Sequence, residues 1–218
     1  MRAKLISLFF LAVSGAAFAQ EVDVGLVNMV VGDVVYVPLA GAPGRVQAFM
    51  KVREGDRLNV PADGQVRVVF FDGSRQERWT GPASFRAGRK AGEPISGKPA
   101  EIASLPAGVP QRIARVPELM QNAKLGGIQV RGGLTRQQKT SLDQQAAVAE
   151  ARTTYEQLRK DMPADDITPE LYLYAALYEF LLYDDMKAVV EEMLRKQPNN
   201  EDVKALAAWV RSRAIGAK

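Results

Sequence analysis

Apolar and polar residues alternate along the chain from about residue 24 to residue 85, between turns rich in glycine and aspartate. The clearest run is at residues 65–71, with Asp63-Gly64 before it and Asp72-Gly73 after it. Asp-Gly pairs tolerate the positive φ angles of tight hairpin turns, and a period of two places apolar side chains on one face of a strand. The pattern predicts an all-β module.

Residues 88–134 fit no regular period, because prolines interrupt them at Pro94, Pro99, Pro106, Pro110 and Pro117. Each proline removes a backbone N–H donor and disfavours long regular elements. We expect an extended tail that wraps the β module, with a short helix at residues 118–123 and a strand at residues 127–131, so that the module spans residues 24–133. A flexible linker is the alternative that the sequence leaves open.

After Gly132-Gly133 the apolar residues recur with the period of a helix. Thr168-Pro169 is typical of a helix start, while Pro163 and Pro198 indicate helix ends. We expect a first helix that starts near Thr135 or Ser141, each of which fits a capping box, and runs to about residue 161. Further helices are expected at about residues 169–182, 185–196 and 201–214. The change of period also predicts a domain boundary, with an α-helical unit at residues 135–216 and a fragment of residues 20–134 that folds without it.

The helical half contains an internal repeat. Four positions recur 35 residues later with the same spacing: Ala151, Tyr155, Leu158 and Pro163 correspond to Met186, Val190, Met193 and Pro198. A period near 34 residues is typical of tetratricopeptide helix pairs. The predicted fold class is therefore multidomain, β then α.

The first 19 residues have the order of a secretory signal peptide. Arg2 and Lys4 precede a short apolar run, and the small residues Ala17 and Ala19 form a cleavage site. We expect cleavage after Ala19, a mature chain that starts at Gln20, and export to the periplasm of a Gram-negative cell. The chain has no cysteine, so we expect no lipoprotein anchor, and no later run approaches the length that spans a membrane.

The composition argues against most catalytic chemistry. The chain has no histidine, which excludes Ser-His and Cys-His nucleophile pairs and ordinary zinc sites. Motifs for phosphate binding, nucleophile elbows and zinc peptidases are also missing. We expect no enzyme, no cofactor and no metal, and we interpret Asp161, Asp165 and Asp166 as helix-terminal charge and capping.

Charge is nearly balanced, with 29 basic and 25 acidic side chains spread along the chain, so we expect no nucleic-acid partner. Arg86, Arg89 and Lys90 form a small basic group after the predicted strands. It could meet an anionic glycan or a lipid head group, although solvated surface is the simpler interpretation.

The order and spacing of several blocks resemble the FecR domain family: residues 24–34, 52–58, 64–70, 72–74 and Gly81-Pro82. The resemblance implies a β-rich periplasmic module, and the founding type relays an outer-membrane receptor signal to a sigma factor linked to the inner membrane. This chain departs from that type because its mature part has no predicted membrane span. Gln76 and Arg78 also stand where the family strand usually has apolar residues, and Trp79 is displaced, which leaves the register of the last hairpin open.

Residues 183–200 are similar to the second helix of a tetratricopeptide repeat, whereas bulky Tyr174 departs from the first helix of that pattern. Such repeats usually stack into a groove that holds a peptide or a protein. The resemblance implies a groove lined by Leu171, Ala175, Tyr178 and Glu179.

A second route to the binding residues uses the helix from Pro169, whose apolar residues surround the whole helix. At 100° per residue, Tyr172, Glu179 and Tyr183 share one narrow stripe, which we expect to face water or a partner. The candidate partner-binding residues are Tyr172, Tyr178, Glu179 and Tyr183.

The sequence thus predicts a non-catalytic periplasmic protein that binds a protein partner or acts as a scaffold in the cell envelope. Two alternatives stay open. One is a glycan- or peptidoglycan-binding module. The other is an accessory part of an envelope signalling system.

Overall fold

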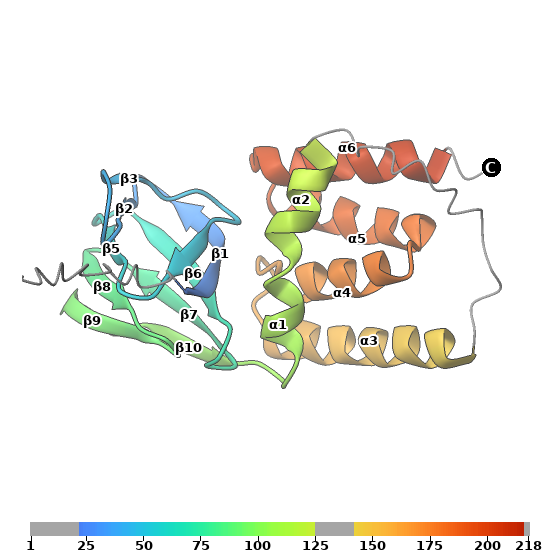
Figure 1. The fold of residues 1–218 in the computed structure, drawn as a ribbon, viewed down its shortest axis with the longest axis horizontal. Helices are drawn as coiled ribbons and strands as arrows, with labels where there is room; N and C mark the ends of the chain where they lie inside the picture. Colours follow the sequence, from blue (N-terminus) through green and yellow to red (C-terminus); the bar gives the residue numbers. More distant parts are fainter. Residues whose placement is uncertain (1–21, 125–141, 216–218) are drawn as a thin grey trace, which may run out of the picture.

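A computed structural model describes residues 22–124 and 142–215, and in it the strands precede the helices (Figure 1). The strands form two five-stranded antiparallel sheets. Sheet A has the order β10-β7-β6-β1-β4: Glu101–Ser104, Arg75–Thr80, Gln65–Phe70, Asp23–Val31 and Lys51–Arg53. Sheet B has the order β3-β2-β5-β8-β9: Gly44–Arg45, Val35–Val37, Arg57–Val60, Ala83–Ala87 and Gly92–Gly97. The predicted β-then-α layout is confirmed.

The two sheets pack face to face around an apolar core. Val66, Val68 and Phe70 alternate along β6 and enter this core, as the period of two predicts. The ring of Trp79 on β7 stacks on the ring of Phe85 on β8 with 4.3 Å between centroids, so aromatic packing joins sheet A to sheet B.

The helices cover the other face of sheet A. Leu26 on β1 and Val69 on β6 belong to the same apolar cluster as the helical residues. Strand β6 is consequently buried on both faces, with every residue from Val66 to Phe70 inaccessible or nearly so. Sheet B, sheet A and the helices therefore form three successive layers (Figure 1).

The helical half is an array in which α3, α4, α5 and α6 lie side by side, each in contact with the next. Their bounds are Leu142–Asp161, Thr168–Glu179, Tyr183–Lys196 and Glu201–Ile215. α4 is buried from Thr168 to Leu177, which explains why apolar residues surround it. It ends at Glu179, before the expected residue 182, since Leu181 adopts a left-handed φ of 55°. None of the helices in the described ranges is long and apolar enough to cross a membrane.

The internal repeat corresponds to equivalent positions in two helices. Ala151 and Leu158 on α3 are buried, as are Met186 and Met193 on α5. Each of these helices ends two residues before its proline, at Asp161 and Lys196. The spacing therefore reflects a repeated packing pattern, while the family to which it belongs stays a prediction.

The segment from residue 88 differs from the expected wrapping tail in one respect. Strands β9 and β10 extend sheets B and A, so residues 92–104 do belong to the β module. Helices α1 (Val109–Ile113) and α2 (Val116–Lys124) instead pack on the helical array, α1 on α4 and α2 on α4 and α6.

The reason is the helical spacing of apolar residues along this part of the chain, which proline at the start of each helix permits: Val109, Ile113, Val116 and Met120 are all buried in the helical cluster. The expected short helix at residues 118–123 lies within α2, which confirms it. The expected strand at residues 127–131 and the boundary at Gly132-Gly133 lie outside the described residues.

Candidate functional site

A surface hollow of about 370 Å³ lies where α1 crosses α4 and approaches α3. We call it the α1–α4 recess, and its lining is mostly polar: Ala107, Gly108, Gln111, Arg112, Arg115, Glu150, Tyr172 and Glu179. Its residues come from α1 and the turn before it, from α3 and from α4. The recess is therefore formed by tertiary packing and has no counterpart in any single stretch of sequence.

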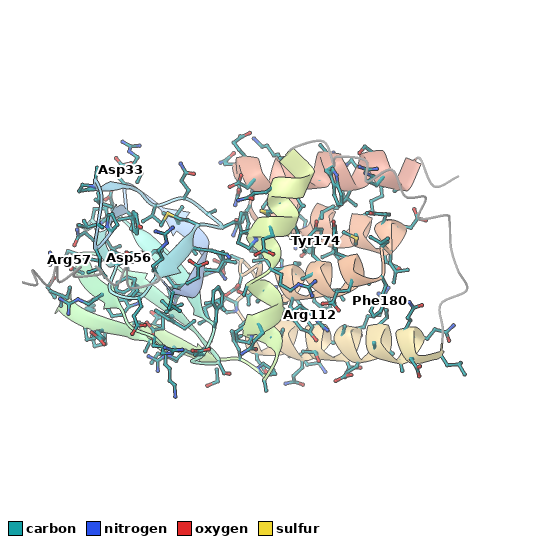
Figure 2. All side chains as sticks on the ribbon, in the orientation of Figure 1. Asp33, Asp56, Arg57, Arg112, Tyr174 and Phe180 are labelled. Atoms are coloured by element: carbon teal, nitrogen blue, oxygen red, sulfur yellow. The ribbon has the colours of Figure 1, made fainter. Side chains whose placement is uncertain are left out.

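Arg112 of α1 and Arg115, which follows α1, hold one carboxylate of α4. Arg115 Nη1 lies 2.6 Å from Glu179 Oε1, and Arg112 Nη2 lies 3.5 Å from Glu179 Oε2. Arg112 also donates from Nη1 to the Tyr172 hydroxyl at 3.2 Å, and its guanidinium carbon lies 5.3 Å from the centre of that ring. Charge-assisted hydrogen bonds and a cation–π contact thus fix α1 on α4 (Figure 2 labels Arg112).

The recess brings together two of the four predicted binding residues, Tyr172 and Glu179. The expectation that the Tyr172 side faces water is wrong, because α1 covers it and leaves this residue only 6 % exposed. Glu179 remains accessible at the recess. Leu171 and Ala175 of the expected groove are buried in the core.

The other two predicted residues lie elsewhere, around Trp209 of α6. The ring centroids of Tyr178 and Tyr183 are 5.8 Å and 5.7 Å from that of Trp209. Tyr183 leaves the predicted stripe because the helix breaks at Leu181 and Tyr183 begins α5. Burial raises the pKa of the Tyr183 hydroxyl, in keeping with a packing position. Whether any of the four contacts a partner stays a prediction.

A second polar group, which we call the junction, joins sheet A to the start of α4. On the sheet side, Asn28 donates from Nδ2 to Gln76 Oε1 at 2.9 Å, and both side chains are buried. On the helix side, Gln76 donates to the Asp166 carboxylate and accepts from the Thr168 hydroxyl. The two hydrogen bonds between Gln76 and the helix side join residues that are 90 positions or more apart in the sequence.

The junction also contains a buried cation. Arg67 on β6 is 2 % exposed, and its Nη2 donates to Asp165 Oδ2 at 2.7 Å. Although partial burial acts to raise it, the hydrogen bond and the charge of Arg67 hold the pKa of Asp165 below its ordinary value. Asp166 accepts from the backbone N–H of Thr168, the first residue of α4, at 2.8 Å. Its charge therefore lies at the helix start as expected, while the N-cap residue itself is Ile167, with no side-chain capping bond.

The structure defines the register of the last hairpin, between β6 and β7, which the sequence left open. In the observed register Val66 pairs with Trp79 and Val69 pairs with Gln76. Trp79 therefore points between the sheets, while Gln76 points toward the helices. Gln76 stands at a position where an apolar residue was expected. This departure was the sequence feature that indicated the junction, because a polar side chain there implies that this face of the strand meets polar groups.

Within the array, Glu170 forms a further buried group with residues of α3 and α5. Lys196 Nζ lies 2.9 Å from Glu170 Oε1, and the Tyr155 hydroxyl donates to the same oxygen at 3.2 Å. The pKa of the Tyr155 hydroxyl is raised to about 12, mainly by burial and also by the negative charge of Glu170. Lys196 thus pairs the buried charge of Glu170 between helices, which is a structural task. Among the described residues no cluster of acidic side chains is placed to hold a metal ion.

Comparisons with protein-family models, with curated proteins and with solved structures gave no match. The resemblances to the FecR domain and to the tetratricopeptide repeat therefore stay predictions.

Proposed function

We propose that this chain is an exported, non-catalytic binding protein of the Gram-negative cell envelope, in which a FecR-like β module and a tetratricopeptide-like array present the α1–α4 recess to a protein partner. The observation that carries the proposal is the pair of arginines at the recess. Arg112 and Arg115 share the carboxylate of Glu179, and their side chains are 29 % and 55 % exposed.

The chemistry of the recess suits a polypeptide. Each guanidinium has five N–H donors, and only part of this capacity is used by Glu179 and Tyr172. Glu150 adds an acceptor on the α3 side. Arginine and tyrosine are enriched among residues that dominate binding energy, and an open, mixed-charge lining fits side chains and peptide groups of a partner better than an apolar small molecule.

The rigidity of the site supports the same proposal. α1 is held to α4 by Arg112 and by the buried side chain of Ile113, and the junction fixes the array on sheet A. A recess that is already formed before binding costs less ordering entropy when a partner arrives. If the partner also touches the β module, the two halves meet it in one fixed arrangement.

The test places a photo-crosslinking amino acid at Ala107, which is exposed and lines the recess, in cells that export the protein. The control places it at Glu156, an exposed position of α3 that does not line the recess. We expect a discrete crosslinked protein from position 107 that is absent from position 156 and weakened by Arg115→Ala. Equal crosslinking from both positions, or none from position 107, contradicts the proposal.

A further inference from the structure

Among residues 22–124 and 142–215, no helix or further strand packs on the outer face of sheet B. Its inner face packs on sheet A, and the helices cover the far side of sheet A (Figure 1). Arg57 on β5 and Arg86 on β8 are exposed on this outer face, and Figure 2 shows Arg57 on the side that points away from the helices. This surface is separate from the α1–α4 recess.

Arg57 and Arg86 are directly opposite one another in the antiparallel register of β5 and β8. Neighbouring strands lie about 5 Å apart, so two like charges face each other at short range, an arrangement that destabilises a sheet. Neither guanidinium forms an ion pair with a carboxylate in the described part of the chain. Glu93 is next to Arg86 in register across β9 but forms no ion pair with it either.

A second pair of directly opposed arginines occurs on sheet A, and there an acidic side chain neutralises each arginine. Arg67 and Arg78 face each other in the register of β6 and β7 on sheet A. There each arginine has an acidic partner, Asp165 for Arg67 and Glu101 for Arg78. Within residues 22–124 and 142–215, carboxylates form ion pairs with both arginines of the sheet A pair, and none forms an ion pair with Arg57 or Arg86.

The outer face of sheet B near Arg57 and Arg86 has polar groups that can bind sugar hydroxyls. Asn59 and Ser84 are opposite one another in the same two strands, two residues along from the arginines, and so lie on the same outer face. They offer amide and hydroxyl groups for hydrogen bonds, and Ser96 on β9 continues this row. Asn59 and Ser84 are half-exposed and Ser96 is exposed, so the row can be reached by a chain of sugars that lies across the strands.

We propose that the outer face of sheet B binds an acidic polysaccharide, with a carboxylate of the polymer between Arg57 and Arg86 and sugar hydroxyls on Asn59 and Ser84. Guanidinium groups bind carboxylates through two parallel hydrogen bonds, which a lysine cannot reproduce. The proposal does not depend on the partner of the recess.

The test measures binding of the mature full-length chain to fluorescein-labelled oligogalacturonate by fluorescence anisotropy. We expect Arg57→Gln with Arg86→Gln to weaken binding at least tenfold, and Arg57→Lys with Arg86→Lys to weaken it by a smaller factor. The matched control is Arg195→Gln with Arg211→Gln, which removes the same charge from two exposed arginines of the helical array that are paired with Glu192 and Glu191. This control should change binding less than twofold.

Three results would overturn the proposal: no binding by the unmodified chain, an equal loss in the control variant, or equally tight binding of a single-stranded DNA of matched charge. The last result would show attraction to any polyanion, including a nucleic acid. Neutral dextran should not bind. The substituted arginines are exposed, so the melting temperature of the Gln variant should be unchanged or higher, and a melting curve verifies the fold.

Discussion

Gln76 on β7 donates a hydrogen bond to Asp166 at the start of α4, and both side chains are buried. This bond joins the β module to the helical array across 90 residues of sequence. It gives a physical reason for a buried glutamine on the face of β7 that meets the helices.

We predict that Gln76→Leu destabilises the protein by about 3 kcal/mol. Leucine removes the donor that Gln76 offers to Asp166 Oδ2, since the Thr168 N–H bonds the other carboxylate oxygen. It also removes the amide oxygen that accepts from Asn28 and from the Thr168 hydroxyl, and buried polar groups left unpaired cost more than the net value of one hydrogen bond. Urea unfolding measures the change. The matched control is Gln65→Leu on the neighbouring strand, whose amide makes only an exposed 3.4 Å hydrogen bond to Thr80. An equal loss in the two variants would show that the junction contributes nothing special.

The pH dependence of Arg67→Gln provides a second test. The pKa of Asp165 is held below the ordinary value of 3.8 in the folded state, so its pairing with Arg67 stabilises the fold at higher pH. This contribution is lost as the pH falls from about 3.8 through the lower folded-state pKa. We expect Arg67→Gln to be less stable than the unmodified protein at pH 7 and the difference to shrink below pH 4. A difference that is constant from pH 7 to pH 3 would contradict this origin.

A third prediction separates burial from partner binding at the recess. Tyr172 lies beneath α1 and is buried. Tyr172→Ala should therefore lower the free energy of unfolding by about 3 kcal/mol or more, as large-to-small substitutions in a core do. Glu179→Ala removes a partly exposed ion pair and should cost about 1 kcal/mol or less. Tyr172→Phe keeps the ring and tests the hydroxyl alone. Similar melting temperatures for Tyr172→Ala and Glu179→Ala would show that Tyr172 is not a core residue.

A fourth prediction concerns cooperativity between the halves. The chain has two tryptophans, Trp79 in the β module and Trp209 in the helical array. Because the helices and sheet A share one apolar cluster, variants with Trp79→Phe or Trp209→Phe should each unfold in urea in one transition, and in each the fluorescence of the remaining tryptophan should coincide with circular dichroism. In either variant, fluorescence and circular dichroism with clearly different midpoints would support the independent β module expected from the sequence.

Much of the fold followed from local pattern. The alternation at residues 65–71 gave β6, and Thr168-Pro169 gave the start of α4. The helix at residues 118–123 was also expected, but its packing on α6 was not, because spacing along one helix does not identify the surface that it meets. Which surface a helix meets depends on the tertiary arrangement of the other elements, and local periodicity contains no information about that arrangement.

The candidate site was less predictable. Tyr172 and Glu179 do share a face of α4, as 100° per residue requires, yet Arg112, which covers Tyr172, lies 60 residues earlier in the chain. Tyr183 was assigned to the same face by extending one helix past Leu181, where the backbone turns. Asn28 gave no signal of its own, because its role depends on Gln76 and Thr168 from other elements.

The most direct test of the proposed function is the affinity of the protein recovered from the crosslink at Ala107, measured by titration calorimetry for the unmodified chain and for Arg115→Ala. The control variant is Arg195→Ala, which removes a somewhat more exposed arginine whose ion pair with Glu192 lies within α5 and outside the recess. We expect at least tenfold weaker binding for Arg115→Ala and unchanged binding for Arg195→Ala. Equal affinities for the two variants would contradict it.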